Sequence, residues 1–252
     1  MKGLLKTGIV AVGLLFTSAS LLAQKKVEVE AQVDLVSKYM WRGLELGDIS
    51  LQPQVEMSWQ GLYLGAYANK GFSMLDEEEF DLSLGYRAPF GINLGVIDYW
   101  QTGVVTNDIY FQYDKGNTAH QLEGNVGFEC KYFSLQGYCY FYGNDYKLDG
   151  TQAYSTYIEL TVPFRLSGLD WTAKAGMTPM ESAGTKTVVN TYGYHINYTY
   201  ADGPACVLAS LRACKELDLR GAKMPIYVEL HANPYLQKLH LLGGVAIKIG
   251  KK

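Results

Sequence analysis

Beyond its first 24 residues, the chain of 252 residues lacks any apolar stretch that approaches a membrane-spanning helix, which needs roughly 20 apolar residues. It also lacks a basic surplus, because 22 basic and 25 acidic residues leave a formal net charge of −3, and nucleic-acid binding requires a basic surface. Its four cysteines and four histidines show neither a CxxC motif nor a paired-histidine spacing, the patterns that hold zinc. These absences argue against a helical membrane protein, a nucleic-acid partner, and a metal or other cofactor.

The first residues follow the layout of a secretory signal peptide. Two lysines precede an apolar run over residues 8–16, and small residues follow it. Cleavage after Ala23 fits best, and cleavage after Ser20 is the alternative. A helical anchor is disfavoured because the apolar run is too short to cross a bilayer. The sequence therefore predicts a signal peptide over residues 1–23 and an exported domain over residues 24–252.

The main signal of the exported domain is an alternation of apolar and polar residues, which is typical of β-strands with one apolar face. Near the start, for example, Val29, Ala31 and Val33 alternate with Glu30 and Gln32. Most of the alternating segments are long enough for a tilted strand of roughly 9–11 residues to cross a membrane. The twelve segments are 27–42, 51–60, 62–69, 79–87, 91–101, 121–129, 133–142, 155–164, 169–177, 207–216, 226–231 and 239–249.

A chain without a spanning helix can enter a membrane only as a closed barrel. We therefore predict an all-β fold, a single antiparallel up-and-down transmembrane β-barrel of about 12 strands. Two further alternating segments, 108–113 and 192–200, would raise the count to 14, but we interpret them as hairpin extensions outside the membrane. A soluble barrel with an apolar interior is the alternative. It is disfavoured because so many strands enclose a lumen wider than side chains fill in eight-stranded barrels.

The connections between the segments alternate in length. Short ones lie near Gln60–Gly61, Ala88–Phe90, Lys131, Leu166–Gly168 and Asp218–Ala222, and longer ones span 43–49, 71–77, 102–118, 144–151, 178–204 and 233–238. Short periplasmic turns and long outer loops are the rule for bacterial barrels, so both termini are expected in the periplasm. Trp41 and Trp100 then fall at outer strand ends, and Trp59 and Trp171 at periplasmic ends. They are candidate interfacial girdles that contact lipid, although tryptophan also packs well in any sheet.

The polar face of the strands carries charges of both signs, and it is expected to line the lumen. The candidate lining residues are Glu28, Asp34, Lys38, Arg42, Glu56, Asp81, Arg87, Glu123, Glu159, Lys174, Arg212 and Glu229. One interpretation is a porin or channel for small hydrophilic solutes or ions, in which charged side chains set the preference. The alternative is a non-conducting structural or surface-interaction barrel that presents Tyr-rich outer loops, 102–118 and 178–204. A network of ion pairs would hold it shut, because unpaired charge away from water is costly.

Two local features suggest specific chemistry. Arg42, followed by Gly43, offers a planar cationic fork that suits a lipopolysaccharide phosphate or a solute, but an ion pair with an inward carboxylate such as Glu56 is favoured. A membrane-embedded lipid hydrolase would need a nucleophile beside a histidine such as His120. No nucleophile motif accompanies it, so we predict no catalytic residue and no enzyme. The cysteines are expected to be free thiols, because Cys130 and Cys139 are out of register across a hairpin.

Several short motifs add a family resemblance. They are Val36–Gly43 with its aromatic-Arg-Gly end, Leu51–Gln54 with its proline, Tyr99–Trp100, Ala153–Tyr157, Lys215–Leu217, Met224–Tyr227 and Asn233–Pro234. Together they resemble TorF-like porins, a family of bacterial outer-membrane barrels, over most of residues 27–249. The resemblance implies a pore in the outer membrane of a Gram-negative cell, with lipid, lipopolysaccharide and the barrel-assembly machinery as partners. It implies no particular substrate. Such barrels commonly end on an aromatic residue that the assembly machinery reads, whereas this chain ends Ile249-Gly250-Lys251-Lys252.

Overall fold

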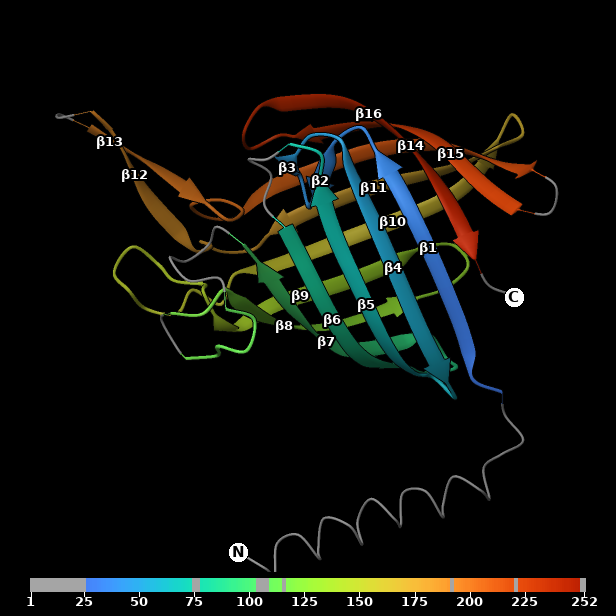
Figure 1. The fold of residues 1–252 in the computed structure, drawn as a ribbon. Coiled ribbons are helices and arrows are strands. Elements are labelled where there is room, and N and C mark those ends of the chain that lie inside the picture. The colour runs from blue at the N-terminus through green and yellow to red at the C-terminus, as the bar shows by residue number, and fades with distance from the viewer. Residues whose placement is uncertain are drawn as a thin grey trace, which may run out of the picture.

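The computed structural model describes residues 26–73, 78–102, 109–114, 117–190, 193–219 and 222–249. Twelve antiparallel strands close into one barrel (Figure 1). The strands are β1 (Glu28–Val36), β4 (Ser50–Trp59), β5 (Leu62–Gly71), β6 (Glu78–Arg87), β7 (Ile92–Gln101), β8 (His120–Glu129), β9 (Ser134–Gly143), β10 (Thr156–Leu166), β11 (Leu169–Thr178), β14 (Ala205–Leu219), β15 (Ala222–Asn233) and β16 (Lys238–Ile249). Each pairs with the next along the chain, and β1 closes the barrel by pairing with β16. The predicted up-and-down barrel of 12 strands is confirmed.

The two ends of the barrel differ in their connections. At the end where β1 begins, two tight turns are made by Gln60–Gly61 and Ser167–Gly168, and all four of these residues have positive φ angles. Two successive residues of this kind form the turn whose twist matches a hairpin. We call this the turn end. The opposite end, the loop end, carries the longer connections, as the sequence predicts. The predicted signal peptide, residues 1–23, lies outside the described residues.

Two short hairpins stand apart from the barrel sheet. One joins β2 (Tyr39–Trp41) to β3 (Leu44–Gly47), and the other joins β12 (Gly184–Asn190) to β13 (Gly193–Tyr198). The β12–β13 hairpin projects beyond the loop end (Figure 1). Of the two segments predicted as extensions, 192–200 therefore contributes a hairpin strand outside the barrel. Within 108–113, residues 109–113 form no strand, and residue 108 lies outside the described residues.

The β2–β3 hairpin corrects one predicted strand boundary. The alternation over 27–42 was interpreted as a single strand, but β1 ends at Val36. Ser37 finishes the pairing with β16, since its backbone N–H donates to the Gly243 carbonyl (2.9 Å) and its Oγ accepts from the Gly243 N–H (3.0 Å). The chain then turns back on itself, and it rejoins the barrel at Ser50, the cross-strand partner of Val36.

The outer wall of the barrel is apolar and exposed. Leu84 is 60% exposed, Val126 60% and Leu241 73%. Outward apolar side chains of this kind occur on nearly every strand, which is the reverse of a soluble barrel, where such side chains fill the interior. None of the described residues forms a helix long and apolar enough to cross a membrane.

The interior is polar and aromatic, and it is filled unevenly along the barrel axis. Inward side chains near the loop end are buried, including Glu79, Glu123, Tyr157 and Asn233. Inward side chains near the turn end are half-exposed, for example Arg87, whose side chain is 51% exposed. The lumen is therefore packed toward the loop end and open toward the turn end.

Candidate functional site

The β2–β3 hairpin lies inside the lumen, and we call it the plug hairpin. Its tip is the turn Arg42–Gly43, with φ angles of 46° and 91°. A Cβ at Gly43 would lie 1.9 Å from the Val207 carbonyl oxygen on β14, and the Gly43 carbonyl accepts a hydrogen bond from Asn233 Nδ2 on β15 (3.2 Å). Only glycine combines this φ angle with so close an approach. The plug hairpin therefore touches the far wall through its backbone.

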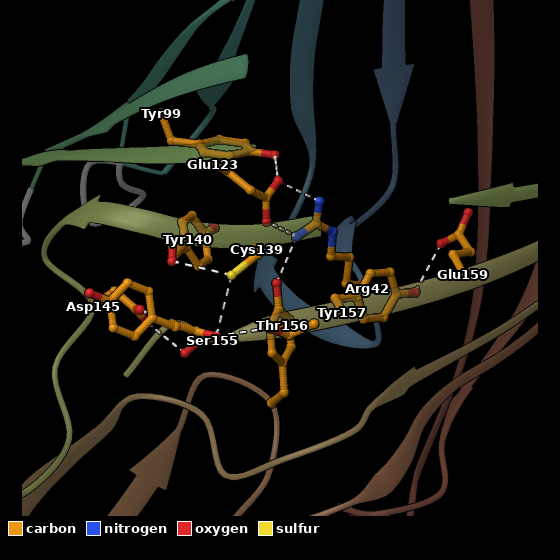
Figure 2. A network of polar contacts seen from close by, with 12 residues as sticks. Arg42, Tyr99, Glu123, Cys139, Tyr140, Asp145, Ser155, Thr156, Tyr157 and Glu159 are labelled. Carbon is orange, nitrogen blue, oxygen red and sulfur yellow. Dashed lines mark hydrogen bonds and ion pairs between the residues drawn. The ribbon is translucent and has the colours of Figure 1, made fainter. Parts of the chain in front are cut away.

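The side chain of Arg42 anchors the plug hairpin to the other side of the lumen. Its Nη1 and Nη2 donate to the two carboxylate oxygens of Glu123 on β8 at 2.5 and 2.8 Å, as Figure 2 shows. Nη1 also donates to the hydroxyl of Tyr200 (2.7 Å), and the Tyr99 hydroxyl donates to Glu123 (2.9 Å). The Arg42 and Glu123 side chains are 8% and 0% exposed. This is a buried, two-pronged ion pair, the strongest geometry that arginine and a carboxylate adopt.

Aromatic rings surround the Arg42 guanidinium group. Its central carbon lies 4.0 Å from the ring centroid of Tyr138, 4.6 Å from that of Trp41 and 4.9 Å from that of Tyr157. Tyr200 stacks on both Trp41 and Tyr157, with centroids 5.8 and 5.4 Å apart. A cation over an aromatic face is attracted by the ring electrons, more strongly where water is excluded. The rings therefore hold the charge and seal the lumen around it.

A buried hydrogen-bond network places Tyr200 in the lumen. The Ser155 hydroxyl donates to Asp145 (2.5 Å, Figure 2) and accepts from the Ala183 N–H (2.7 Å). The Ser182 hydroxyl accepts from the Tyr200 N–H (2.8 Å). The side chains of Asp145, Ser155 and Ser182 are all fully buried. The base of the β12–β13 hairpin is thereby fixed to the 144–155 loop, and Tyr200 is directed toward Arg42.

A cavity of about 1050 Å³ occupies the rest of the lumen. Trp41 and Tyr39 of the plug hairpin and Tyr99 of β7 close its inner end, and exposed charged side chains such as Arg87 and Lys223 line its outer part. The cavity-lining residues toward the loop end, such as Tyr39 and Tyr99, are buried, and those toward the turn end, such as Arg87 and Lys223, are exposed. The cavity therefore opens at the turn end. The lumen is thus a one-sided vestibule with the plug hairpin as its inner wall.

Most of the predicted lining charges lie in ion pairs. The pairs are Arg42–Glu123, Arg87–Glu56, Lys174–Glu159 and Arg212–Glu229, with nitrogen–oxygen distances of 2.5 to 3.0 Å. Asp34 accepts hydrogen bonds from Gln32 and Gln54, and Glu28 is exposed at the start of β1. Asp81 has one carboxylate oxygen without a partner. The favoured partner of Arg42 is corrected from Glu56 to Glu123. That these residues line a conducting path stays a prediction.

Lys38 is placed differently from its prediction. It lies in the connection between β1 and the plug hairpin, where its amine donates to Glu45 and, at 3.3 Å, to Asp48. The hydrogen bond with Glu45 raises the pKa of Lys38 and lowers the pKa of Glu45. Lys38 therefore braces the plug hairpin from within.

The predicted interfacial tryptophans divide into two groups. Trp59 and Trp171 lie at the turn end, and Trp100 lies at the loop end beside Tyr110. The prediction that Trp41 lies at the lipid interface is wrong, because Trp41 packs inside the barrel against Tyr200. The alternation of apolar and polar residues continues from β1 through Trp41 into the plug hairpin. The position of Trp41 in the sequence therefore gives no sign that the chain turns inward.

His120 points outward at the loop end, where the 109–114 segment covers it and leaves it fully buried. Its Nδ1 contacts Asp98 (2.7 Å), its Nε2 contacts the Tyr110 carbonyl oxygen, and the Tyr113 ring stacks on it. A general base needs a free ring nitrogen within reach of the substrate. Both nitrogens are engaged here, so the arrangement fastens the 109–114 segment to the barrel and gives no support to a hydrolase. All four cysteines carry free thiols.

Sequence reasoning missed the tyrosines that complete the site, namely Tyr99, Tyr138, Tyr157 and Tyr200. The first three lie on the inward face of their strands, and that parity was the available signal. Tyr200 comes from a long connection, and nothing in its neighbourhood in the sequence indicates that it enters the lumen.

Comparison with solved structures finds outer-membrane channels at low similarity. An outer-membrane channel from Pseudomonas putida F1 shares 12% identity, with 90% of this chain and 95% of that chain covered and a TM-score of 0.41. Salmonella typhi OmpF, in complex with daunomycin, shares 9% identity with 90% and 98% covered, at 0.37. A structure from work on the in-meso crystallization of membrane proteins shares 10% identity with 88% and 83% covered, at 0.44. All three identities are 12% or lower, and all three TM-scores lie below 0.5.

The sequence itself matches one family model. No curated protein matches the chain. Residues 22–209 match a family described as bacterial protein of unknown function, Gcw_chp. The matched range includes the plug hairpin, Glu123 and Tyr200, and it extends into β14. The chain therefore belongs to the Gcw_chp family of bacterial proteins.

Proposed function

We propose that this protein is an outer-membrane channel for small hydrophilic solutes or ions that rests closed, with the plug hairpin as its gate. The observation that carries the proposal is the plug hairpin itself, which is a separate two-stranded sheet inside the lumen. Val36 and Ser50 remain paired across its base, so the barrel closes without it. The barrel does not need this segment, and its one buried ion pair, joined by hydrogen bonds and ring contacts, holds it in the lumen. Such a segment is suited to move.

The outer wall supports the membrane part of the proposal. Exposed apolar side chains cover it, and transmembrane barrels present such a band to lipid. Trp59 and Trp171 at one end and Trp100 at the other suit the two interfaces. Together with the predicted signal peptide over residues 1–23 and the resemblance to TorF-like porins, these features support a place in the outer membrane of a Gram-negative cell. Lipid, lipopolysaccharide and the assembly machinery are then its partners.

The orientation follows from the connections. The short turns, the start of β1 and the end of β16 all lie at the turn end. Bacterial barrels place that end in the periplasm. The vestibule then opens to the periplasm, and the packed loop end faces outward with the projecting β12–β13 hairpin. A solute crossing the barrel must pass the Arg42–Glu123 pair, because the plug hairpin and the aromatic rings fill the lumen there.

Planar-bilayer recording of the purified, folded barrel tests the proposal. The matched variant replaces residues 37–49 by the dipeptide Asn-Gly, which closes a hairpin between paired residues such as Val36 and Ser50. We expect brief, rare openings from the wild type and steady channels from the variant. Heat-modifiable migration on gels and a β-sheet circular dichroism spectrum establish that the variant folds. A folded variant that never conducts would refute the channel, and a wild type that conducts as freely as the variant would refute the gate.

A non-conducting surface barrel is the second candidate. The four lumen ion pairs and the packed loop end favour it, because they fill the path that a solute would take. The β12–β13 hairpin would then be the contact element. The same recordings separate the two, since a structural barrel shows no openings in the wild type, whereas a gated channel opens briefly.

A further inference from the structure

The inner end of the vestibule contains a carboxylate that the protein satisfies only in part. Asp81 on β6 lines the cavity, and the residue is buried, with only 8% of its surface exposed. The Trp100 backbone N–H donates to the carboxylate, but Oδ1 has no hydrogen-bond partner among the described residues. Buried carboxylates in folded proteins are almost always hydrogen-bonded or paired, so an unpartnered oxygen here calls for an explanation.

The charges around Asp81 do not supply a cation. The charged groups that act on it most strongly are the carboxylates of Glu79, Asp98 and Glu123. Glu79 accepts hydrogen bonds from the Tyr39 hydroxyl and from Gln101, and Glu123 is paired with Arg42. Asp81 is therefore left as the acidic group at the inner end of the vestibule whose charge the described residues do not balance.

Aromatic rings form the rest of this inner end. Tyr39 and Trp41 of the plug hairpin, Tyr67 of β5 and Tyr99 of β7 all line the cavity beside Asp81. Aromatic faces attract organic cations, and quaternary ammonium groups and amines are bound in such surroundings. No group of three or more His, Cys, Asp or Glu side chains among the described residues could hold a metal ion. A carboxylate among rings favours an organic cation.

The cavity has room for such a ligand and a route of entry. Its volume of about 1050 Å³ lies just above the range of roughly 300–1,000 Å³ that is typical of small-molecule sites. Its walls carry five carboxylates, at Glu30, Glu56, Asp81, Glu129 and Glu216, and three cationic side chains, at Arg87, Lys223 and Lys248. The acidic excess attracts cations from the turn end.

We propose that the vestibule binds a small organic cation, an amine or a guanidinium compound, with its charged group at Asp81 and its body against Tyr39, Trp41, Tyr67 and Tyr99. The ligand enters at the turn end while the plug hairpin is closed. The proposal rests on the proposed function only for the statement that the turn end faces the periplasm. Binding itself requires no conduction.

The test measures binding of benzylammonium to the folded barrel in detergent micelles at pH 7, by isothermal titration calorimetry and by the intrinsic tryptophan fluorescence, to which Trp41 contributes from the cavity wall. Benzyl alcohol, nearly isosteric and neutral, controls for partition into detergent. The variant is Asp81→Asn. The matched control is Asp34→Asn, the same change in a lumen carboxylate that already accepts from Gln32 and Gln54.

We expect saturable binding of benzylammonium, none of benzyl alcohol, and affinity at least about tenfold lower in Asp81→Asn, as for the loss of a hydrogen bond to a charged group. Asp34→Asn should bind like the wild type. Equal binding of the ammonium and the alcohol overturns the proposal on wild-type protein alone, even if the variant does not fold. Displacement by equimolar K⁺ or Mg²⁺ also overturns it, in favour of a simple ion site. Binding without conduction refutes only the channel, and conduction without binding refutes only this site.

Discussion

Replacing Arg42 by methionine should open the barrel, because it removes the cation and keeps a side chain of similar length. Glu123, whose side chain is fully buried, would keep the Tyr99 hydroxyl as its only hydrogen-bond donor among the described residues. Removing one partner of a buried ion pair costs roughly 3–5 kcal/mol, because the remaining charge is left uncompensated. When the plug hairpin leaves the lumen, water reaches Glu123, so this cost falls on the closed state alone.

The expected effect on gating follows directly. Each 1.4 kcal/mol changes an equilibrium about tenfold, so the ratio of open to closed states should rise by a factor of about 10² to 10³ or more. Single-channel recording measures that ratio as open probability. The double variant Arg42→Met with Glu123→Leu should close again, because a whole buried pair can be replaced by apolar side chains at little cost.

A second ion pair in the same lumen provides the control. Arg87 contacts Glu56 at the same two distances, 2.5 and 2.8 Å, but these side chains are 51% and 36% exposed. Exposed pairs contribute about 1 kcal/mol or less, so Arg87→Met should change open probability less than about tenfold. If the Arg42 and Arg87 variants opened the barrel equally, or if the double variant stayed as open as Arg42→Met, burial of the pair would not be what holds the gate.

Three further outcomes are expected. Gly43→Ala should raise open probability, because its φ of 91° and a Cβ 1.9 Å from the Val207 carbonyl oxygen force the tip from the wall; unchanged gating would contradict the close contact. Lys38 lowers the pKa of Glu45 below its ordinary 4.5, so their contact is intact above that pH and is lost as the pH falls through the lowered value. Open probability should rise only in that acid range, and Glu45→Gln should remove the response. A variant with Trp171 as its only tryptophan should be quenched by lipids brominated near the headgroup; no quenching would place it away from lipid.

The barrel could be predicted from the sequence because its signal is local and repeated. Each strand carries its own alternation, and a slip of one residue would turn every apolar side chain to the wrong face. Turns such as Gln60–Gly61 and Ser167–Gly168 are marked by glycine, which tolerates the left-handed backbone they require. The number of strands and the order of their pairing follow from these signals and from the short connections between neighbours.

The plug hairpin could not be predicted in the same way. Residues 39–41 continue the alternation of β1, so the pattern is the same whether the chain proceeds along the wall or turns into the lumen. The contacts that decide between the two are distant in the sequence. Arg42 is 81 residues from Glu123 and 158 residues from Tyr200. The Arg42-Gly43 pair indicates a special position in the sequence, but nothing in the sequence indicates that Glu123 is the partner of Arg42.

The choice of an ion pair to hold the plug hairpin has a physical consequence for gating. An apolar plug would be held by burial, and it would resist entry of water into the lumen at every stage. The Arg42–Glu123 pair adds little net stability, because desolvation of both charges offsets most of their attraction, yet it strongly disfavours any arrangement in which one charge is buried alone. Half-open states are thereby penalised, and fully closed and fully hydrated states are left as the two stable arrangements. A gate of this kind is two-state, and its balance responds to whatever else binds or hydrates the lumen.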